Sequence, residues 1–94
     1  MNAPAQPTFL WHDYETFGAD TRHDRPAEFA CWRTDASFEP VAEPVSLRCR
    51  PTLDYLPEPA ACAVTGIGPE VAFASGLDEP DFALAVQTQM SEAQ

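Results

Sequence analysis

Three segments in the first half of the chain have the apolar pattern of β-strands. Residues 8–14 are mostly aromatic or β-favouring and end in polar side chains, which predicts a first strand that is buried along most of its length. Residues 28–34 resume this pattern, and residues 45–50 alternate between apolar and polar positions. The stretch 16–26 has the turn composition of an irregular loop, and residues 35–37 predict a tight turn. Together these segments predict a three-stranded meander.

The second half of the chain predicts helices. The segment 51–59 contains three prolines and is a connector, because proline cannot continue a helix or a central strand. A short helix over residues 60–65 is expected to end at Gly66, and a second is expected to start at Pro69. Residues 79–90 predict an amphipathic helix that covers a sheet. Its apolar stripe, expected to be buried, consists of Phe82, Ala85, Val86 and Met90.

Length limits the chain to one small domain or part of a larger one. Its 94 residues can hold a single core, and a hydrophobic fraction of 45% argues against disorder. Fifteen acidic residues against five basic ones give a net charge of −10, and every basic residue is an arginine. Affinity for nucleic acids depends on neutralising phosphates with basic side chains. The 94 residues are therefore not expected to bind DNA or RNA tightly by themselves. Acidic surfaces do bind divalent cations.

Targeting and redox features are few. No run approaches the ~20 apolar residues of a membrane span, and the N-terminus lacks a basic region followed by an apolar one. A cytoplasmic protein without a membrane partner is therefore expected. Cys31, Cys49 and Cys62 form no C-x-x-C pair, which favours reduced thiols over a disulfide framework or a zinc site. Residues 1–7 predict a disordered lead-in to one domain over residues 8–94.

The informative chemistry lies at the end of the first predicted strand. Residues i and i+2 of a strand point the same way, so Asp13 and Glu15 are expected to project from one face. Two such carboxylates repel each other unless a cation lies between them. Mg²⁺ typically takes one or two protein carboxylates and completes its shell with water and phosphate oxygens. Taken alone the pair is a weak signal, because short acidic pairs occur by chance in an acidic protein.

Several segments, in order, resemble one family. Residues 8–18, TFLWHDYETFG, look like the first motif of the exodeoxyribonuclease I family, part of the DEDD exonuclease superfamily with a ribonuclease H-like fold. The loop DRPA at 24–27, the connector DYLP at 54–57 and the segment TGI at 65–67 also match. The resemblance implies an α/β fold. The chain would be the incomplete, truncated N-terminal portion of an exonuclease domain, a three-stranded meander followed by helices.

The resemblance also implies an activity. The complete enzyme would remove nucleotides 3′ to 5′ from single-stranded DNA by two-metal hydrolysis, releasing 5′-mononucleotides in DNA repair. Its cofactors would be two Mg²⁺ ions, with Mn²⁺ as a substitute, and a single-stranded-DNA-binding protein would be a partner. Asp13 would bridge the two ions, and Glu15 would ligate one and approach the terminal 3′-hydroxyl. The seat of the terminal nucleotide would be lined by Thr16, Phe17 as an aromatic wall, and Gly18, with Thr65, Gly66 and Ile67 beside it.

The family pattern is only partly present. Two further aspartates and a general-base histidine have no matching segment, so the 94 residues alone are expected to have little or no activity. His12 should point away from the face of Asp13 and have a structural role, and His23 lies in a polar loop. Two alternatives stay open. One is a naturally short, non-catalytic binding or assembly module, and the other is an RNA exonuclease resembling oligoribonuclease or ribonuclease T.

Two tryptophans and two arginines on the predicted strands have a structural as well as a functional interpretation. Trp11 and Trp32 lie on neighbouring predicted strands and are expected in the core rather than as stacking platforms for bases. Arg48 and Arg50 either contact phosphate or guard a strand edge with charge.

Overall fold

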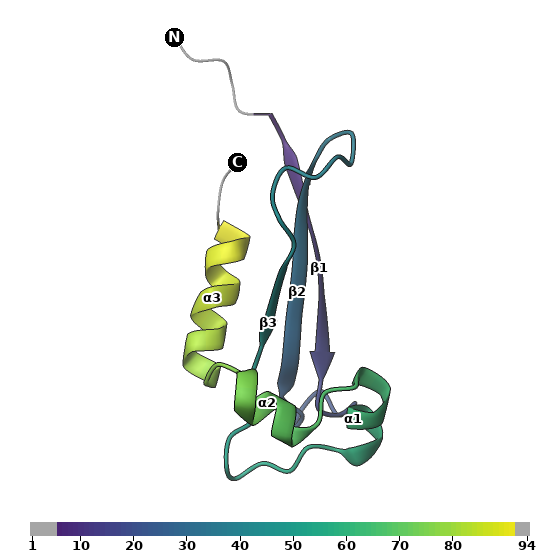
Figure 1. Cartoon of the computed structure of the whole chain (residues 1–94), viewed down its shortest axis with the longest axis vertical. Helices are drawn as coiled ribbons and strands as arrows, with labels where there is room; N and C mark the ends of the chain where they lie inside the picture. The colour runs from purple at the N-terminus through teal and green to yellow at the C-terminus, as the bar shows by residue number, and fades with distance from the viewer. Residues whose placement is uncertain (1–5, 92–94) are drawn as a thin grey trace.

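The computed structural model describes residues 6–91, which form three strands followed by three helices (Figure 1). Most of the lead-in predicted over residues 1–7 lies outside this range. The predicted meander followed by helices is confirmed. The elements are β1 (Thr8–Thr16), β2 (Pro26–Asp35), β3 (Val45–Arg48), α1 (Pro59–Thr65), α2 (Pro69–Ser75) and α3 (Glu79–Ser91).

The strands form one sheet with the order β1-β2-β3, and both strand pairs are antiparallel. The ladder between β1 and β2 keeps one register from Thr8 opposite Asp35 to Glu15 opposite Glu28, and it shifts before Thr16. Residues directly opposite each other in such a ladder point to the same face. The register therefore decides which side chains of β1 share a face with those of β2.

The strand β3 is shorter than the alternation over residues 45–50 predicts. After Arg48 the chain pairs with the segment between α2 and α3 instead, through a parallel bridge between Cys49 and Leu77. The amide of Leu77 donates to the carbonyl of Arg48 at 2.9 Å. The amide of Arg50 donates to the carbonyl of Leu77 at 2.7 Å. These bonds anchor the start of α3 to the sheet.

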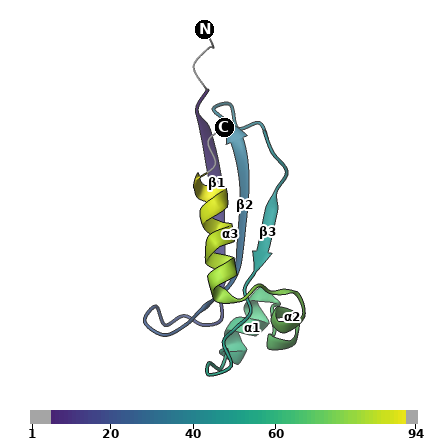
Figure 2. The same ribbon diagram turned by 90° about the vertical axis from the view of Figure 1, so that its left-hand side faces the viewer.

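The helix α3 lies along one face of the sheet, as Figure 2 shows. Apolar side chains of the middle strand meet those of the helix, which removes them from water and stabilises the packing. The buried members of this first core are Phe29, Cys31, Cys49, Phe82 and Val86.

A second, smaller core joins the loop after β1 to the two short helices at the end of the sheet (Figure 1). Tyr55 and Cys62 are half-buried against it. Its buried members are Phe17, Ala27, Ile67 and Ala72.

The ends of the short helices follow the sequence signals. Pro59 and Pro69 occupy the first turns of α1 and α2, where a missing amide hydrogen costs nothing. Gly66 ends α1 with a φ of 76°, and its amide donates to the carbonyl of Cys62 at 2.9 Å. That left-handed conformation is easy for glycine and strained for other residues.

Three burial predictions are wrong. The strand β1 is mostly exposed rather than buried, because among residues 6–91 nothing pairs with its outer edge. Trp11 and Trp32 are 52% and 45% exposed, since they lie opposite each other on the sheet face away from α3. Met90 is 45% exposed because it lies in the last turn of α3, whereas Phe82 and Val86 are buried.

The three thiols are free, as expected, with Cys31 and Cys49 buried and Cys62 half-buried. Burial raises the pKa of the Cys49 thiol to about 11, helped by the carboxylates of Glu79 and Asp78. Among the helices of residues 6–91, none has the length and apolar character needed to cross a bilayer.

Candidate active site

The carboxylates of Asp13 and Glu15 project from the face of the sheet that α3 does not cover. Asp13 lies opposite Ala30 and Glu15 opposite Glu28 in the β1–β2 ladder. The intervening side chains take the α3 face, where the rings of His12 and Tyr14 lie 5.8 and 5.1 Å from that of Phe29. The period of the strand thus brings the two carboxylates together and separates them from His12, as the sequence predicted.

A groove of about 400 Å³ opens where β1 ends. One wall comes from the end of β1 and the loop that follows, and the other from α1. Four of the residues predicted for metal or nucleotide binding, Glu15, Thr16, Gly18 and Thr65, line it together. The other lining residues are Tyr14, Ala19, Glu58, Ala60, Ala61 and Val64.

The first wall is a tight turn that two hydrogen bonds to backbone carbonyls stabilise. The hydroxyl of Thr16 donates to the carbonyl of Gly18 at 2.7 Å, and the amide of Phe17 donates to the carbonyl of Arg25 at 2.9 Å. Gly18 is buried against the carboxyl group of Asp24, which a Cβ at this position would overlap. A side chain at position 18 would therefore displace the Asp24 carboxyl group from its hydrogen bonds.

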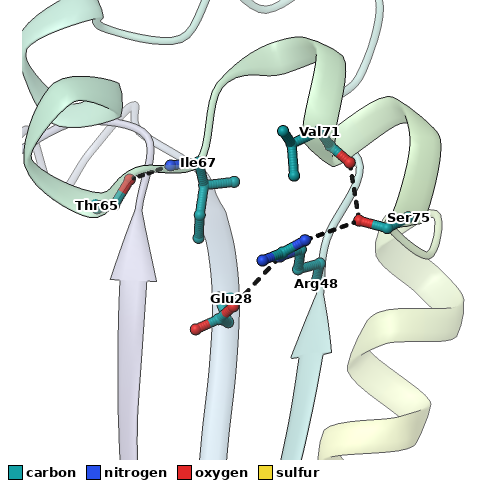
Figure 3. Close-up of polar contacts among 6 residues, drawn as sticks. All are labelled: Glu28, Arg48, Thr65, Ile67, Val71 and Ser75. Atoms are coloured by element: carbon teal, nitrogen blue, oxygen red, sulfur yellow. Dashed lines mark hydrogen bonds and ion pairs between the residues drawn. The ribbon is translucent and has the colours of Figure 1, made fainter.

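Two predicted contact residues support the groove from behind. Phe17 and Ile67 are 0% and 3% exposed in the second core. The expectation that the Phe17 ring forms an aromatic wall needs correction, because the turn after β1 points it inward. Ile67 donates its amide to the hydroxyl of Thr65 at 3.1 Å, so it orients a lining residue (Figure 3). Gly66 is exposed at the end of α1.

A third carboxylate shares the face of the predicted metal pair. Like charges directly opposite each other destabilise a sheet, and Glu28 lies opposite Glu15. Arg48 offsets this repulsion, since its Nε lies 3.4 Å from Glu28 Oε2 and its Nη1 donates to Ser75 Oγ at 3.3 Å (Figure 3). Arg48 therefore serves an internal ion pair here.

The other arginine singled out from the sequence is also paired, since Arg50 lies 3.4 Å from Asp78. His23 is exposed, and its ring lies 6.1 Å from that of Tyr55. Within residues 6–91, no group of three or more His, Cys, Asp or Glu is arranged to hold a metal ion. Two carboxylates are nevertheless within the number that Mg²⁺ takes from a protein, so Asp13 and Glu15 fit a partial ligand set.

Known proteins resemble this chain in sequence and in structure. The model of the exonuclease family matches residues 10–79, most of the chain. The chain belongs to the exonuclease family. Exodeoxyribonuclease I of Escherichia coli (strain K12) is 49% identical to this exonuclease-family chain over 83 residues, which are 88% of the chain and 18% of that protein. The chain thus spans about a fifth of the length of such relatives.

Solved structures of exonuclease I confirm the fold assignment. E. coli exonuclease I in complex with a dT13 oligonucleotide superposes with a TM-score of 0.88 at 47% identity, covering 93% of this chain and 19% of that one. An ExoI/SSB-Ct complex gives 0.90 at 46% identity, covering 94% and 19%. The sheet and helices of this exonuclease-family chain are therefore part of a ribonuclease H-like fold.

The sequence pattern does not reveal several residues that line the groove. Glu58 and Ala61 face the end of β1 because the amide of Glu58 donates to the carbonyl of Phe17 at 2.8 Å. This bond joins segments far apart in the chain, so no local pattern reveals it. The one available signal is Pro59, which marks a helix start but not the neighbour of that helix.

Proposed function

We propose that this chain supplies the first metal-binding carboxylates and part of the nucleotide seat of a 3′–5′ exonuclease acting on single-stranded DNA. One observation carries the proposal. Asp13 and Glu15 share a face at the end of β1, beside a groove lined by Thr16, Gly18 and Thr65, in a chain 49% identical to E. coli exodeoxyribonuclease I. The relative crystallised with dT13 supports single-stranded DNA as the ligand class.

Each residue has a role in this proposal. Asp13 and Glu15 would hold the divalent cations, Mg²⁺ or Mn²⁺, and Glu15 would also lie near the terminal 3′-hydroxyl. When bound, such cations activate water and neutralise the phosphate. The backbone of Thr16, Phe17 and Gly18 and the segment 65–67 hold the terminal nucleotide in place. The product is a 5′-mononucleotide.

Charge limits what these residues do alone. The chain carries a net charge of −10, and three of its arginines lie within 3.5 Å of carboxylates, namely Arg25, Arg48 and Arg50. Phosphate contacts in this proposal therefore depend on divalent cations and on basic groups outside these 94 residues. The ExoI/SSB-Ct complex supports a single-stranded-DNA-binding protein as a further partner of the protein containing this chain.

Replacing Asp13 by asparagine tests the metal assignment. We expect Asp13→Asn to weaken Mn²⁺ binding by at least about tenfold, since even the outer partners of metal ligands cost about 10–100-fold when removed. Isothermal titration calorimetry of the protein that contains this chain measures this affinity. Equal affinities of the wild type and the variant, or no saturable binding by either, would contradict the assignment.

The matched control is Asp35→Asn at the opposite end of β2. It removes the same charge, and its Oδ1 still accepts from the turn amides of Ser37 and Glu39, which lie at 2.8 and 3.0 Å in the wild type. Its Mn²⁺ affinity should match that of the wild type. Comparing dT13 with an oligouridine of the same length then separates the DNA nuclease from the RNA exonuclease alternative, which tighter binding of RNA would favour.

A further inference from the structure

The loop after β1 and the connector before α1 are joined by one short hydrogen bond. The hydroxyl of Tyr55, in the connector, donates to Asp24 Oδ1 in the loop at 2.6 Å. The second carboxylate oxygen, Oδ2, accepts from the amide of Asp20 at 2.8 Å. Asp24 thus binds its own loop with one oxygen and the connector with the other.

Both partners of this hydrogen bond pack against residues of the groove or of the second core. The carboxyl group of Asp24 lies directly against Gly18, which lines the groove. The Tyr55 ring packs on the second core, 6.3 Å from the ring of Phe17. Burial and the Asp24 carboxylate raise the pKa of Tyr55 to about 12, and the hydrogen bond from Tyr55 lowers that of Asp24. The hydroxyl therefore stays protonated and the carboxylate ionised at neutral pH.

The two partners sit behind opposite walls of the groove. Asp24 supports the wall formed by the end of β1 and Gly18. Tyr55 lies in the segment that leads to Glu58, whose amide donates to Phe17 O at 2.8 Å and from which α1 starts. Because α1 supplies the other wall, a shift of the connector would change the distance between the walls, although neither Asp24 nor Tyr55 lines the groove.

We propose that the Asp24–Tyr55 hydrogen bond is a positioning clamp that sets the separation of the groove walls, and with it the fit of the 3′-terminal nucleotide. This inference rests on the proposed function, because the occupant of the groove is the nucleotide assigned there. Asp24 and Tyr55 are positioning residues that act through Gly18 and α1.

Removing the Tyr55 hydroxyl tests the clamp. In the protein that contains this chain, Tyr55→Phe keeps the ring in the core and deletes one hydrogen bond to a charged group, so we expect about a tenfold weaker affinity for 5′-fluorescein-labelled dT13 with Mg²⁺ present. Fluorescence anisotropy, measured well below the melting temperature of each variant, gives the affinity. A purely structural role would lower the melting temperature and leave this affinity unchanged, which would overturn the proposal.

Variants of Asp24 provide a graded comparison. Asp24→Asn keeps an oxygen that accepts from Tyr55, so its affinity should lie between those of the wild type and Asp24→Ala. Asp35→Asn removes the same charge at the far hairpin and should bind as the wild type does. Equal effects of Asp24→Asn and Asp24→Ala would show that the oxygen accepting from Tyr55 does not determine the affinity, which also overturns the clamp.

Hydrogen exchange of single amides separates the clamp from the proposed function. Tyr55→Phe should speed exchange of the Phe17 and Glu58 amides at least about tenfold and leave that of Cys31 in β2 unchanged. If the wild-type protein that contains this chain does not bind dT13 but these amides exchange faster in Tyr55→Phe, the proposed function fails and the clamp stands as a structural device. If they exchange at the wild-type rate, the clamp is wrong whatever the binding result.

Discussion

At the residue scale, neighbouring groups determine how readily the carboxyl groups of the loop and the connector ionise. The ionised carboxylate of Asp24 accepts hydrogen bonds from the Tyr55 hydroxyl and the Asp20 amide, which lowers its pKa. The pKa of Asp54 is also lowered, chiefly by the side chain of Thr52. A lowered folded-state pKa contributes stability above the unfolded value, and that stability is lost as the pH falls. The loop and the connector should therefore loosen first on acidification.

The titration of Tyr55 provides a direct test of this pair. Burial, and then the hydrogen bond to Asp24, raise its pKa to about 12 from a usual value of 10.0. The neutral hydroxyl thus stabilises the fold below pH about 10, and this contribution is lost as the pH rises toward 12. In a Tyr14→Phe background Tyr55 is the one remaining tyrosine. Ultraviolet absorbance of tyrosinate should then show that Asp24→Asn lowers the pKa of Tyr55. An identical titration curve in both proteins would refute the coupling.

At the scale of the elements, α3 holds the sheet together through two side chains. Phe82 and Val86 are 4% and 8% exposed and meet Phe29 and Cys31 of β2. The acidic residues Glu79 and Asp81 lie in the first turn of α3, where the positive end of the helix dipole stabilises their negative charges. The helix therefore depends on its buried face for stability, as short amphipathic helices generally do.

Truncating that face should have a large effect. Phe82→Ala is expected to lower the free energy of unfolding by about 3–5 kcal/mol, because a buried aromatic leaves a cavity when removed. Leu84→Ala on the same helix is the matched control. Leu84 is 62% exposed, so its loss should change stability by no more than about 0.5 kcal/mol. Urea titrations followed by circular dichroism measure both, and similar effects of the two changes would contradict the assigned packing of α3.

At the scale of the whole molecule, residues 6–91 are elongated and leave much apolar surface exposed. The radius of gyration is 15.7 Å, against about 13 Å for a compact domain of 100 residues. The rings of Phe9, Trp11 and Phe38 form an exposed cluster with centroids 5.6–6.1 Å apart. They lie beside the outer edge of β1, which has no partner strand among residues 6–91.

The isolated 94-residue chain should consequently be loosely folded and prone to aggregation. An unpaired edge strand beside exposed aromatics is a template for association between chains. We expect a broad thermal transition by circular dichroism and concentration-dependent light scattering. A sharp, cooperative and reversible melt at high concentration would show that the described core is sufficient by itself.

The sequence alone determined the elements of this chain and which side chains of β1 share a face. Alternation along β1 places Asp13 and Glu15 on one face and His12 on the other, and prolines and glycines mark the ends of the short helices. Such signals are local, because strand period, proline geometry and left-handed glycine depend on neighbouring residues. The family resemblance rests on equally local motifs, which is why fold and family were predicted correctly.

Tertiary structure alone decided burial and the shape of the groove. It buried Phe17 and exposed Trp11, Trp32 and most of β1, because burial depends on which elements cover a face and not on the residue itself. It also joined Glu58 to Phe17 and Tyr55 to Asp24 across long stretches of chain. Hydrogen bonds between distant segments leave no period in the sequence, so the walls of the groove and the clamp behind them emerge only when the chain is folded.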